Sequence, residues 1–179
     1  MQRKEADMSG SSYLLPILMS GLAMVFGGTL VNASDTTDAD AKALRMALDD
    51  EYRAEATYAA VIEAFGEVRP FIRIIDAERR HAARVKAEMD RLGIGYDPAN
   101  PYLGSIPAPP TLLAACEQGV SAEIENIALY DRLLPTIRDQ GVRAVLSNLQ
   151  RASRERHLPA FERCVARGGQ AGRGPGRRR

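Results

Sequence analysis

A proline- and glycine-rich stretch from Gly93 to Pro110 separates two blocks of helical pattern. Prolines interrupt an α-helix because they lack the amide hydrogen and clash with the preceding turn. Extended, these eighteen residues could reach on the order of 60 Å, whereas a helix of about 25 residues is about 38 Å long. The connection can therefore run the full length of a helical bundle and start the next helix at its far end.

Apolar side chains recur every three or four residues in four stretches, the pattern of amphipathic helices. No stretch alternates as a strand would. The four stripes are Leu44 to Phe65, Phe71 to Leu92, Leu113 to Leu134, and Val142 to Cys164. Gly66 is a natural helix stop, and Pro135 should weaken the end of the third helix. We expect an all-α, antiparallel four-helix bundle over residues 41–167, with one long crossover between the second and third helices.

Glu78 and His81 lie inside the apolar stripe of the second helix, three positions apart. An ionised carboxylate on the face that turns toward the core costs several kcal/mol unless it is paired or binds a cation. Their position on this face, more than their spacing, makes both residues candidates for metal ligands.

The two short turns predict which residues share a level in each hairpin. Glu51 lies fifteen positions before the turn at residue 66, and His81 lies fifteen positions after it. Glu123 and His157 each lie seventeen positions from the turn near residue 140. Each hairpin therefore offers a carboxylate and an imidazole at mid-height.

Helices one and three repeat a glutamate followed by a tyrosine seven positions later, Glu51 with Tyr58 and Glu123 with Tyr130. This repeat favours a duplicated site. The tyrosines could donate hydrogen bonds to metal-binding carboxylates, act as one-electron donors, or simply pack in the core.

Several stretches of the chain resemble the ferritin-like superfamily, in particular the rubrerythrin-type carboxylate-bridged di-iron proteins. These are DEYRAEATYAAVIEAFGEVRPF, EIENIALYDRLL and NLQRASRERHLPAFERC. More closely, they are similar to an uncharacterised ferritin-like family, the domain of unknown function 2202, over about Ala41 to Arg167. The resemblance implies a ferritin-like bundle with a di-metal site among its helices.

The resemblance implies five metal ligands, which are Glu51, Glu78, His81, Glu123 and His157. The pattern's remaining carboxylate is expected three residues before His157, where this chain has Arg154. Glu155 lies on another side of the helix, whereas Glu55 could be an extra ligand. Arg154 could instead pair with Glu123 or Glu51. Three interpretations stay open at this point: a modified two-metal site, a single-metal site, and a metal-free network of salt bridges.

Oxygen and nitrogen ligands of this mix suit iron, manganese or zinc. With iron, the protein would be an oxidoreductase of the ferroxidase or peroxidase type that acts on O₂ or peroxide. The alternatives are a bundle that binds metal without turnover, and a metal-free bundle that serves as a structural or interaction module. We expect a monomer or a homodimer.

Cys116 and Cys164 each lie 24 positions from the turn near residue 140, which places them side by side. This favours a disulfide that closes a loop of 48 residues, although both could be buried thiols. In the chain-entropy description such a bridge contributes about 4 kcal/mol.

The first residues predict export to the periplasm or the extracellular space. Residues 13–31 carry no charge and follow Arg3 and Lys4, which is typical of a signal peptide over residues 1–33. The alternative is a membrane anchor formed by residues 13–31. A polar linker is expected over residues 34–40, and a disordered Gly/Arg tail over residues 168–179.

The formal net charge of +1 becomes −3 without the four arginines of the tail, so we expect no binding of nucleic acid by the domain.

Overall fold

The computed structural model describes residues 38–170 of the chain. The predicted signal segment, residues 1–33, and residues 171–179 of the predicted tail lie outside the described residues. All regular secondary structure within residues 38–170 is helical, and these residues contain no strand. In chain order the elements are α1 (Asp38–Phe65), α2 (Phe71–Arg91), α3 (Leu112–Leu133), η1 (Leu134–Thr136), α4 (Gln140–Ala152), η2 (Ser153–His157) and α5 (Leu158–Ala166).

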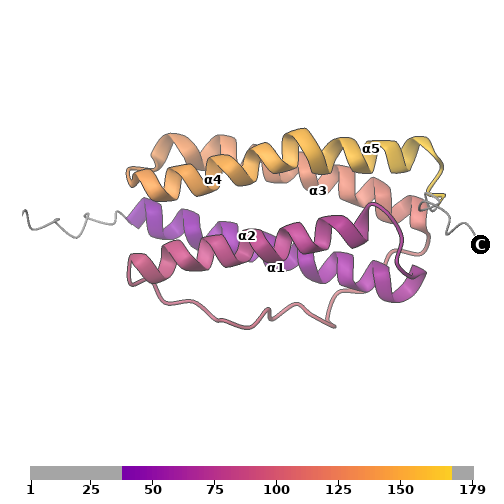
Figure 1. Ribbon diagram of the computed structural model, residues 1–179, viewed down its shortest axis with the longest axis horizontal. Coiled ribbons are helices and arrows are strands. Elements are labelled where there is room, and N and C mark those ends of the chain that lie inside the picture. Colours follow the sequence, from indigo (N-terminus) through magenta and orange to yellow (C-terminus); the bar gives the residue numbers. More distant parts are fainter. Residues whose placement is uncertain (1–37, 171–179) are drawn as a thin grey trace, which may run out of the picture. The chain divides into compact units, whose positions relative to one another are not determined.

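The elements form four antiparallel rods arranged as two hairpins (Figure 1). The first hairpin is α1 with α2, and the second is α3 with the continuous rod made of α4, η2 and α5. In Figure 1, α2 and the α4–α5 rod lie in front of α1 and α3. This arrangement confirms the predicted all-α bundle.

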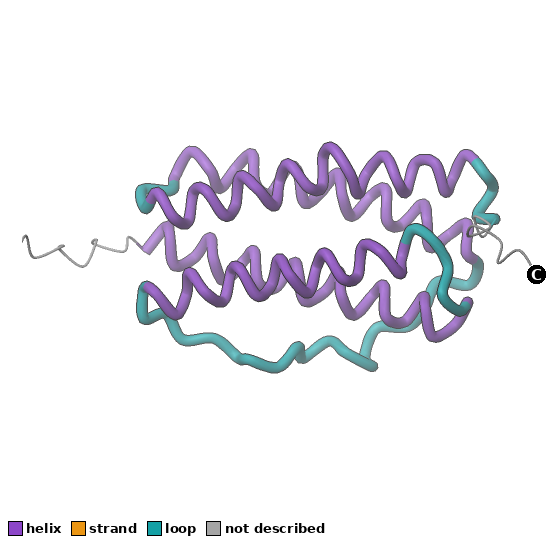
Figure 2. The backbone as a smooth tube through the Cα atoms, viewed as in Figure 1, coloured by secondary structure: helices purple, strands orange, loops and turns teal. Residues whose placement is uncertain are grey.

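Residues 92–111 form the long connection between α2 and α3, which follows the outside of the bundle (Figure 2). Hydrogen bonds hold it against α1. The hydroxyl of Tyr52 donates to the carbonyl oxygen of Asp97 at 3.0 Å, and the amide of Asn100 donates to the carbonyl oxygen of Tyr52 at 2.8 Å. These hydrogen bonds tie the crossover to α1, and its path along the bundle is the one that its length allowed.

Local sequence signals define several helix ends. Gly66 ends α1 with a φ of 81°, a conformation that only glycine adopts readily. The side chain of Thr111 caps α3, and that of Asp139 caps α4 by accepting from the amide of Val142. Pro135 lies in the short 3₁₀ turn η1, which confirms that the third helix weakens there.

The start of α1 differs from the prediction. The helix begins at Asp38, so the last three residues of the predicted linker are helical. Asp40 is fully buried, and one of its carboxylate oxygens accepts a hydrogen bond of 2.9 Å from the backbone amide of Arg138. This long-range contact with the turn of the second hairpin fixes the first turn of α1.

The fourth rod also differs from the continuous α-helix that its stripe predicted. Residues Ser153–His157 form a π-helical segment, η2, in which hydrogen bonds reach the fifth residue instead of the fourth. One extra residue is therefore accommodated in this turn. The side chains before and after the segment keep their inner face, but the positions within it change their direction.

The apolar core consists of two clusters, one near each end of the bundle. The first includes Leu44, Met89 and Leu146, and the second includes Phe71 and Phe161. The second cluster also contains the disulfide Cys116–Cys164, which joins α3 to α5 and confirms that predicted pair. Most of the buried polar residues occupy the level between the two clusters, whereas Asp40 lies at the end of the bundle that holds the turn of the second hairpin.

None of the helices within residues 38–170 has the length and apolar character needed to cross a membrane.

Candidate metal centre

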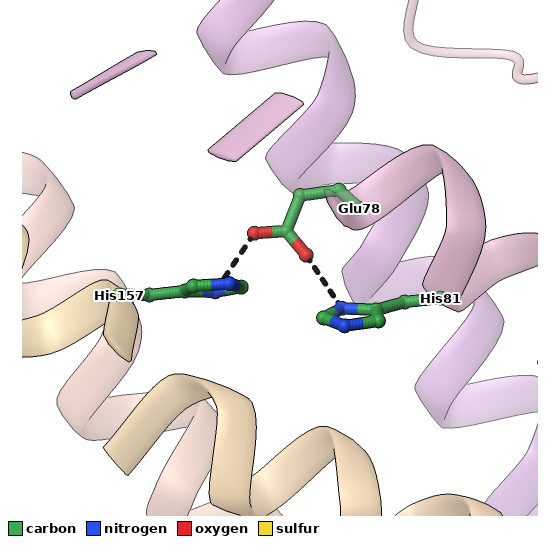
Figure 3. A group of neighbouring side chains, drawn as sticks. All are labelled: Glu78, His81 and His157. Atoms are coloured by element: carbon green, nitrogen blue, oxygen red, sulfur yellow. Dashed lines mark hydrogen bonds and ion pairs between the residues drawn. The ribbon is translucent and has the colours of Figure 1, made fainter. Parts of the chain in front are cut away.

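Glu78 of α2 lies between two histidines at the centre of the bundle (Figure 3). Its Oε2 is 2.9 Å from Nδ1 of His81, which follows one turn later on the same helix. Its Oε1 is 3.1 Å from Nδ1 of His157, which comes from η2. All three side chains are buried, and the two imidazole rings stack with their centroids 5.5 Å apart. A single carboxylate thus connects the two hairpins.

Two further carboxylates complete the cluster, one beside each histidine. Oε2 of Glu51 is 3.3 Å from Nδ1 of His81, and Oε1 of Glu123 is 3.5 Å from Nδ1 of His157. Both pairings were predicted from the distance of each residue to its turn, and both are confirmed. The five residues form two similar halves that share Glu78.

Each outer glutamate accepts a hydrogen bond from a tyrosine of the other hairpin. The hydroxyl of Tyr58 donates to Oε1 of Glu123 at 3.1 Å, and that of Tyr130 donates to Oε1 of Glu51 at 3.2 Å. Both tyrosines are buried. Burial, together with the neighbouring negative charge of Glu123 or Glu51, raises the pKa of each phenol well above its usual value. Both hydroxyls therefore stay protonated and orient the carboxylates.

Burial and charge shift the pKa values of the cluster in different directions. Burial favours a neutral imidazole, but contacts with Glu51 and Glu78 raise the pKa of His81 to about 9. Contacts with Glu123 and Glu78 likewise overcome burial and raise the pKa of His157 to about 10. Without a metal, both histidines are therefore protonated at neutral pH. Their positive charge balances part of the carboxylate charge.

The carboxylates show the same competition. Burial alone would raise the pKa of Glu78, but its contacts with His157 and His81 lower that pKa to about 2. Burial and the charge of Glu78 raise the pKa of Glu51 well above its usual value. The centre therefore attracts positive charge, either as protons or as a cation.

The polar atoms of this centre fit a metal ion. Among residues 38–170, Nδ1 of His157 is a buried side-chain nitrogen without a hydrogen bond, although two carboxylate oxygens are close to it. Buried polar atoms nearly always have partners. Glu78, His81 and His157 each offer one ligand atom, and these atoms lie within 4.8 Å of one another. This buried group could hold a metal ion.

Arg154, which stands where the sequence pattern expects a sixth ligand, does not point into the cluster. The side chain of Arg154 is 55% exposed, and its Nη2 lies 3.4 Å from Oδ1 of Asp131. The predicted pairing of Arg154 with Glu123 or Glu51 was therefore wrong. The extra residue in η2 directs Ser153, four positions before His157, into the bundle instead. Glu155 is exposed, as expected.

Glu55, the predicted extra ligand, is directed elsewhere. Its Oε1 is 2.9 Å from Nε of Arg79, and its Oε2 accepts a hydrogen bond of 3.0 Å from the amide of Asn100. Both carboxylate oxygens thus face α2 and the crossover, so the structure does not bring Glu55 into the cluster.

Three polar residues beside the cluster had no role in the sequence interpretation. The amide of Asn126 donates to Asp50, and the hydroxyl of Ser153 donates to Oδ1 of Asn126 at 2.8 Å. Burial raises the pKa of Asp50 to about 6 despite the hydrogen bond from Asn126. A usable signal was present, because Ser153 interrupts the apolar stripe before His157 and Asn126 lies one turn after Glu123.

Two pockets approach the centre from opposite sides of the bundle. The larger, of about 720 Å³, lies between α2 and the η2–α5 part of the fourth rod and reaches His81 and His157. The smaller, of about 180 Å³, opens between α1 and α3 and is lined by Asp50, Glu51 and Glu123 among others. Small molecules or ions could thus reach the centre from either side.

Comparison with known proteins gives information about the fold of this chain only. No protein-family model matches the chain, and no curated protein matches it. The fold is similar to that in the crystal structure of a hypothetical protein from Methanococcus jannaschii, with a TM-score of 0.65 and 19% sequence identity. The match covers 76% of this chain and 85% of that chain. The resemblance to the domain of unknown function 2202 stays a prediction.

Proposed function

We propose that this protein is a ferritin-like metal-binding protein whose centre holds divalent metal between its two hairpins. The proposed ligands are Glu51, Glu78, His81, Glu123 and His157. The observation that carries the proposal is the position of Glu78, which directs one carboxylate oxygen toward each histidine. The ferritin-like part of the proposal is supported by the sequence resemblance of residues 41–167 to ferritin-like proteins.

The two similar halves of the cluster favour a modified two-metal site over a single-metal site. Each half has its own glutamate and histidine, and Glu78 is shared. The three carboxylates supply three negative charges, one fewer than two divalent ions require for neutrality. Asp50, whose pKa responds to Glu123 and Glu78, is the next carboxylate along the small pocket.

Iron is the metal we propose, and manganese and zinc suit the same ligands. Bound iron would supply O₂ or peroxide chemistry of the ferroxidase or peroxidase type. The chain's own residues prepare the site for it. Tyr58 and Tyr130 hold Glu123 and Glu51 by hydrogen bonds, and their buried hydroxyls can provide a proton or an electron close to the centre.

Any reducing equivalents would come from outside this chain. Rubrerythrins carry a rubredoxin-like cysteine site for this purpose, whereas the two cysteines of this chain are joined to each other. A disulfide of this kind is typical of proteins in oxidising compartments. We therefore propose an exported protein whose electron donor is a separate molecule.

A metal-free bundle is the second candidate, and one observation favours it. The raised pKa values of His81 and His157 show that protonation alone can neutralise much of the cluster. Such a network would make the protein a structural or interaction module. Nδ1 of His157 is paired with Glu78 at 3.1 Å but forms no hydrogen bond with it. This weighs against a closed network, because such a network would align the two groups.

Metal content distinguishes these proposals. The protein is purified from its native compartment, analysed by elemental mass spectrometry, and then titrated anaerobically with Fe(II). We expect two ions per chain, no metal in Glu78→Gln, and a metal-dependent rise of the melting temperature. Glu55→Gln is the matched control, because it removes a carboxylate at the same helix pair but outside the cluster, and it should bind metal normally.

A single ion per chain would replace the two-metal proposal by the single-metal alternative. No bound metal after loading with Fe(II), Mn(II) and Zn(II) would overturn metal binding and leave the structural module. Metal binding without consumption of O₂ or peroxide would overturn the oxidoreductase part only.

A further inference from the structure

The larger of the two pockets at the centre is surrounded by arginine. Its volume is about 720 Å³, and it contains no acidic residue in its lining. Its inner end is formed by His81 and His157. Seven arginines line it, which are Arg69, Arg73, Arg80, Arg84, Arg156, Arg163 and Arg167.

The arginines follow the same spacing on the two antiparallel rods that form the pocket. On α2 the order is Arg73, Ala77, Arg80 and Arg84, and on the fourth rod it is Arg156, Ala160, Arg163 and Arg167. Steps of four, three and four residues keep side chains on one face of a helix. Each rod therefore presents guanidinium groups to the pocket around a small alanine, which leaves space between them.

None of these seven guanidinium groups forms an ion pair within residues 38–170. Other arginines of the bundle do so, such as Arg79 with Glu55 and Arg91 with Asp139. Like charges around one concave surface repel each other and produce a positive potential that concentrates anions. Guanidinium groups bind phosphate and carboxylate through paired hydrogen bonds.

We propose that this pocket binds a small molecule with at least two phosphate or carboxylate groups and holds it against His81 and His157. A volume of about 720 Å³ is in the usual range for binding sites of metabolite-sized ligands. Binding of the anion itself requires no metal. That the bound anion is a substrate of the centre rests on the metal-binding function proposed above. Cations would enter separately, through the acid-lined pocket between α1 and α3.

Calorimetric titration of the metal-free protein with inorganic pyrophosphate, and in parallel with citrate, tests the proposal at constant ionic strength. The protein is first freed of metal with a chelator, because both probes also bind metals, and the chelator is then removed. We expect saturable binding of one molecule per chain for at least one probe. The double variant Arg80→Gln/Arg156→Gln should weaken it at least tenfold, since it removes one guanidinium from each rod beside the histidines.

Arg45→Gln/Arg132→Gln is the matched control. It removes the same charge from exposed positions of α1 and α3 outside the pocket, and it should leave the affinity unchanged. Circular dichroism and the melting temperature verify that both variants fold. Equal weakening in both variants would reveal non-specific attraction and overturn the proposal, as would the absence of saturable binding of either probe.

Glu78→Gln separates this proposal from the metal proposal. If the variant loses metal but still binds the probe, the anion pocket is independent of the centre's metal. If wild-type protein binds metal but neither probe, the pocket proposal is wrong and the metal centre stands.

Discussion

The hydroxyl of Tyr58 on α1 donates a hydrogen bond to Glu123 on α3, at 3.1 Å. Tyr130 on α3 and Glu51 on α1 repeat the relationship in the opposite direction. The seven-residue repeat of the sequence therefore appears in space as a crossed pair, in which each helix orients the carboxylate of the other.

Tyr58→Phe should destabilise the metal-free protein by about 1–2 kcal/mol, because a buried carboxylate loses its donor. The ring contacts with Phe71 and Phe161 remain, so packing is preserved. Urea unfolding measures the change. Tyr96→Phe is the control, since the hydrogen bond of Tyr96 to Asp90 is exposed and its loss should have a much smaller effect on stability. Equal losses in the two variants would contradict the crossed-pair interpretation.

The free energy of unfolding of the metal-free protein should fall as the pH rises from 6.5 to about 10. The pKa values of His81 and His157 are raised from 6.5 to about 9 and about 10, so their stabilising contribution is complete below pH 6.5. It is lost as the pH passes through the raised values. Chemical unfolding at several pH values, with chelator present, measures the slope.

The variant His81→Gln provides the comparison for this pH dependence. It removes one of the two titrating groups, so its stability should change less between pH 6.5 and about 9. An unchanged slope would show that other groups cause the loss.

Arg154→Glu should leave metal binding unaltered and change stability by less than about 0.5 kcal/mol, because Arg154 is exposed beside Asp131. Ser153→Asp should act differently. It adds a buried carboxylate beside Asp50 and Asn126, and we expect a loss of about 1–3 kcal/mol without metal. Bound metal should reverse that loss. Melting curves with and without Fe(II) show which of the two positions, 153 or 154, faces the metal centre.

Gly119→Ala should destabilise the bundle by about 1–3 kcal/mol. A Cβ atom at Gly119 would lie 2.5 Å from the ring of Phe161, which is fully buried against Tyr58 and Phe71. In Gly141→Ala the new atom would meet the ends of Arg91 and Glu88, which can move because Arg91 is exposed. Denaturant midpoints that fall equally in both variants would contradict the close packing of α3 on α5.

The sequence determined which residues share a level of the bundle. Short turns fix the antiparallel register, so the distance to the turn placed Glu51 beside His81, Glu123 beside His157, and Cys116 beside Cys164. Periodicity identified the four rods because each buries one apolar stripe. The buried Glu78 was recognisable for the same reason, since a carboxylate within such a stripe needs a partner.

Only the tertiary structure decided the direction of individual side chains and the neighbours of each rod. An α-helical projection placed Arg154 toward the site, but the π-helical segment inserts one residue and directs Ser153 inward instead. Glu55 had a suitable position on α1, yet Arg79 and Asn100 bind its carboxylate on another side. The arginine-lined pocket also depends on α2 facing the η2–α5 part of the fourth rod, because spacing along one helix carries no information on which helix faces it.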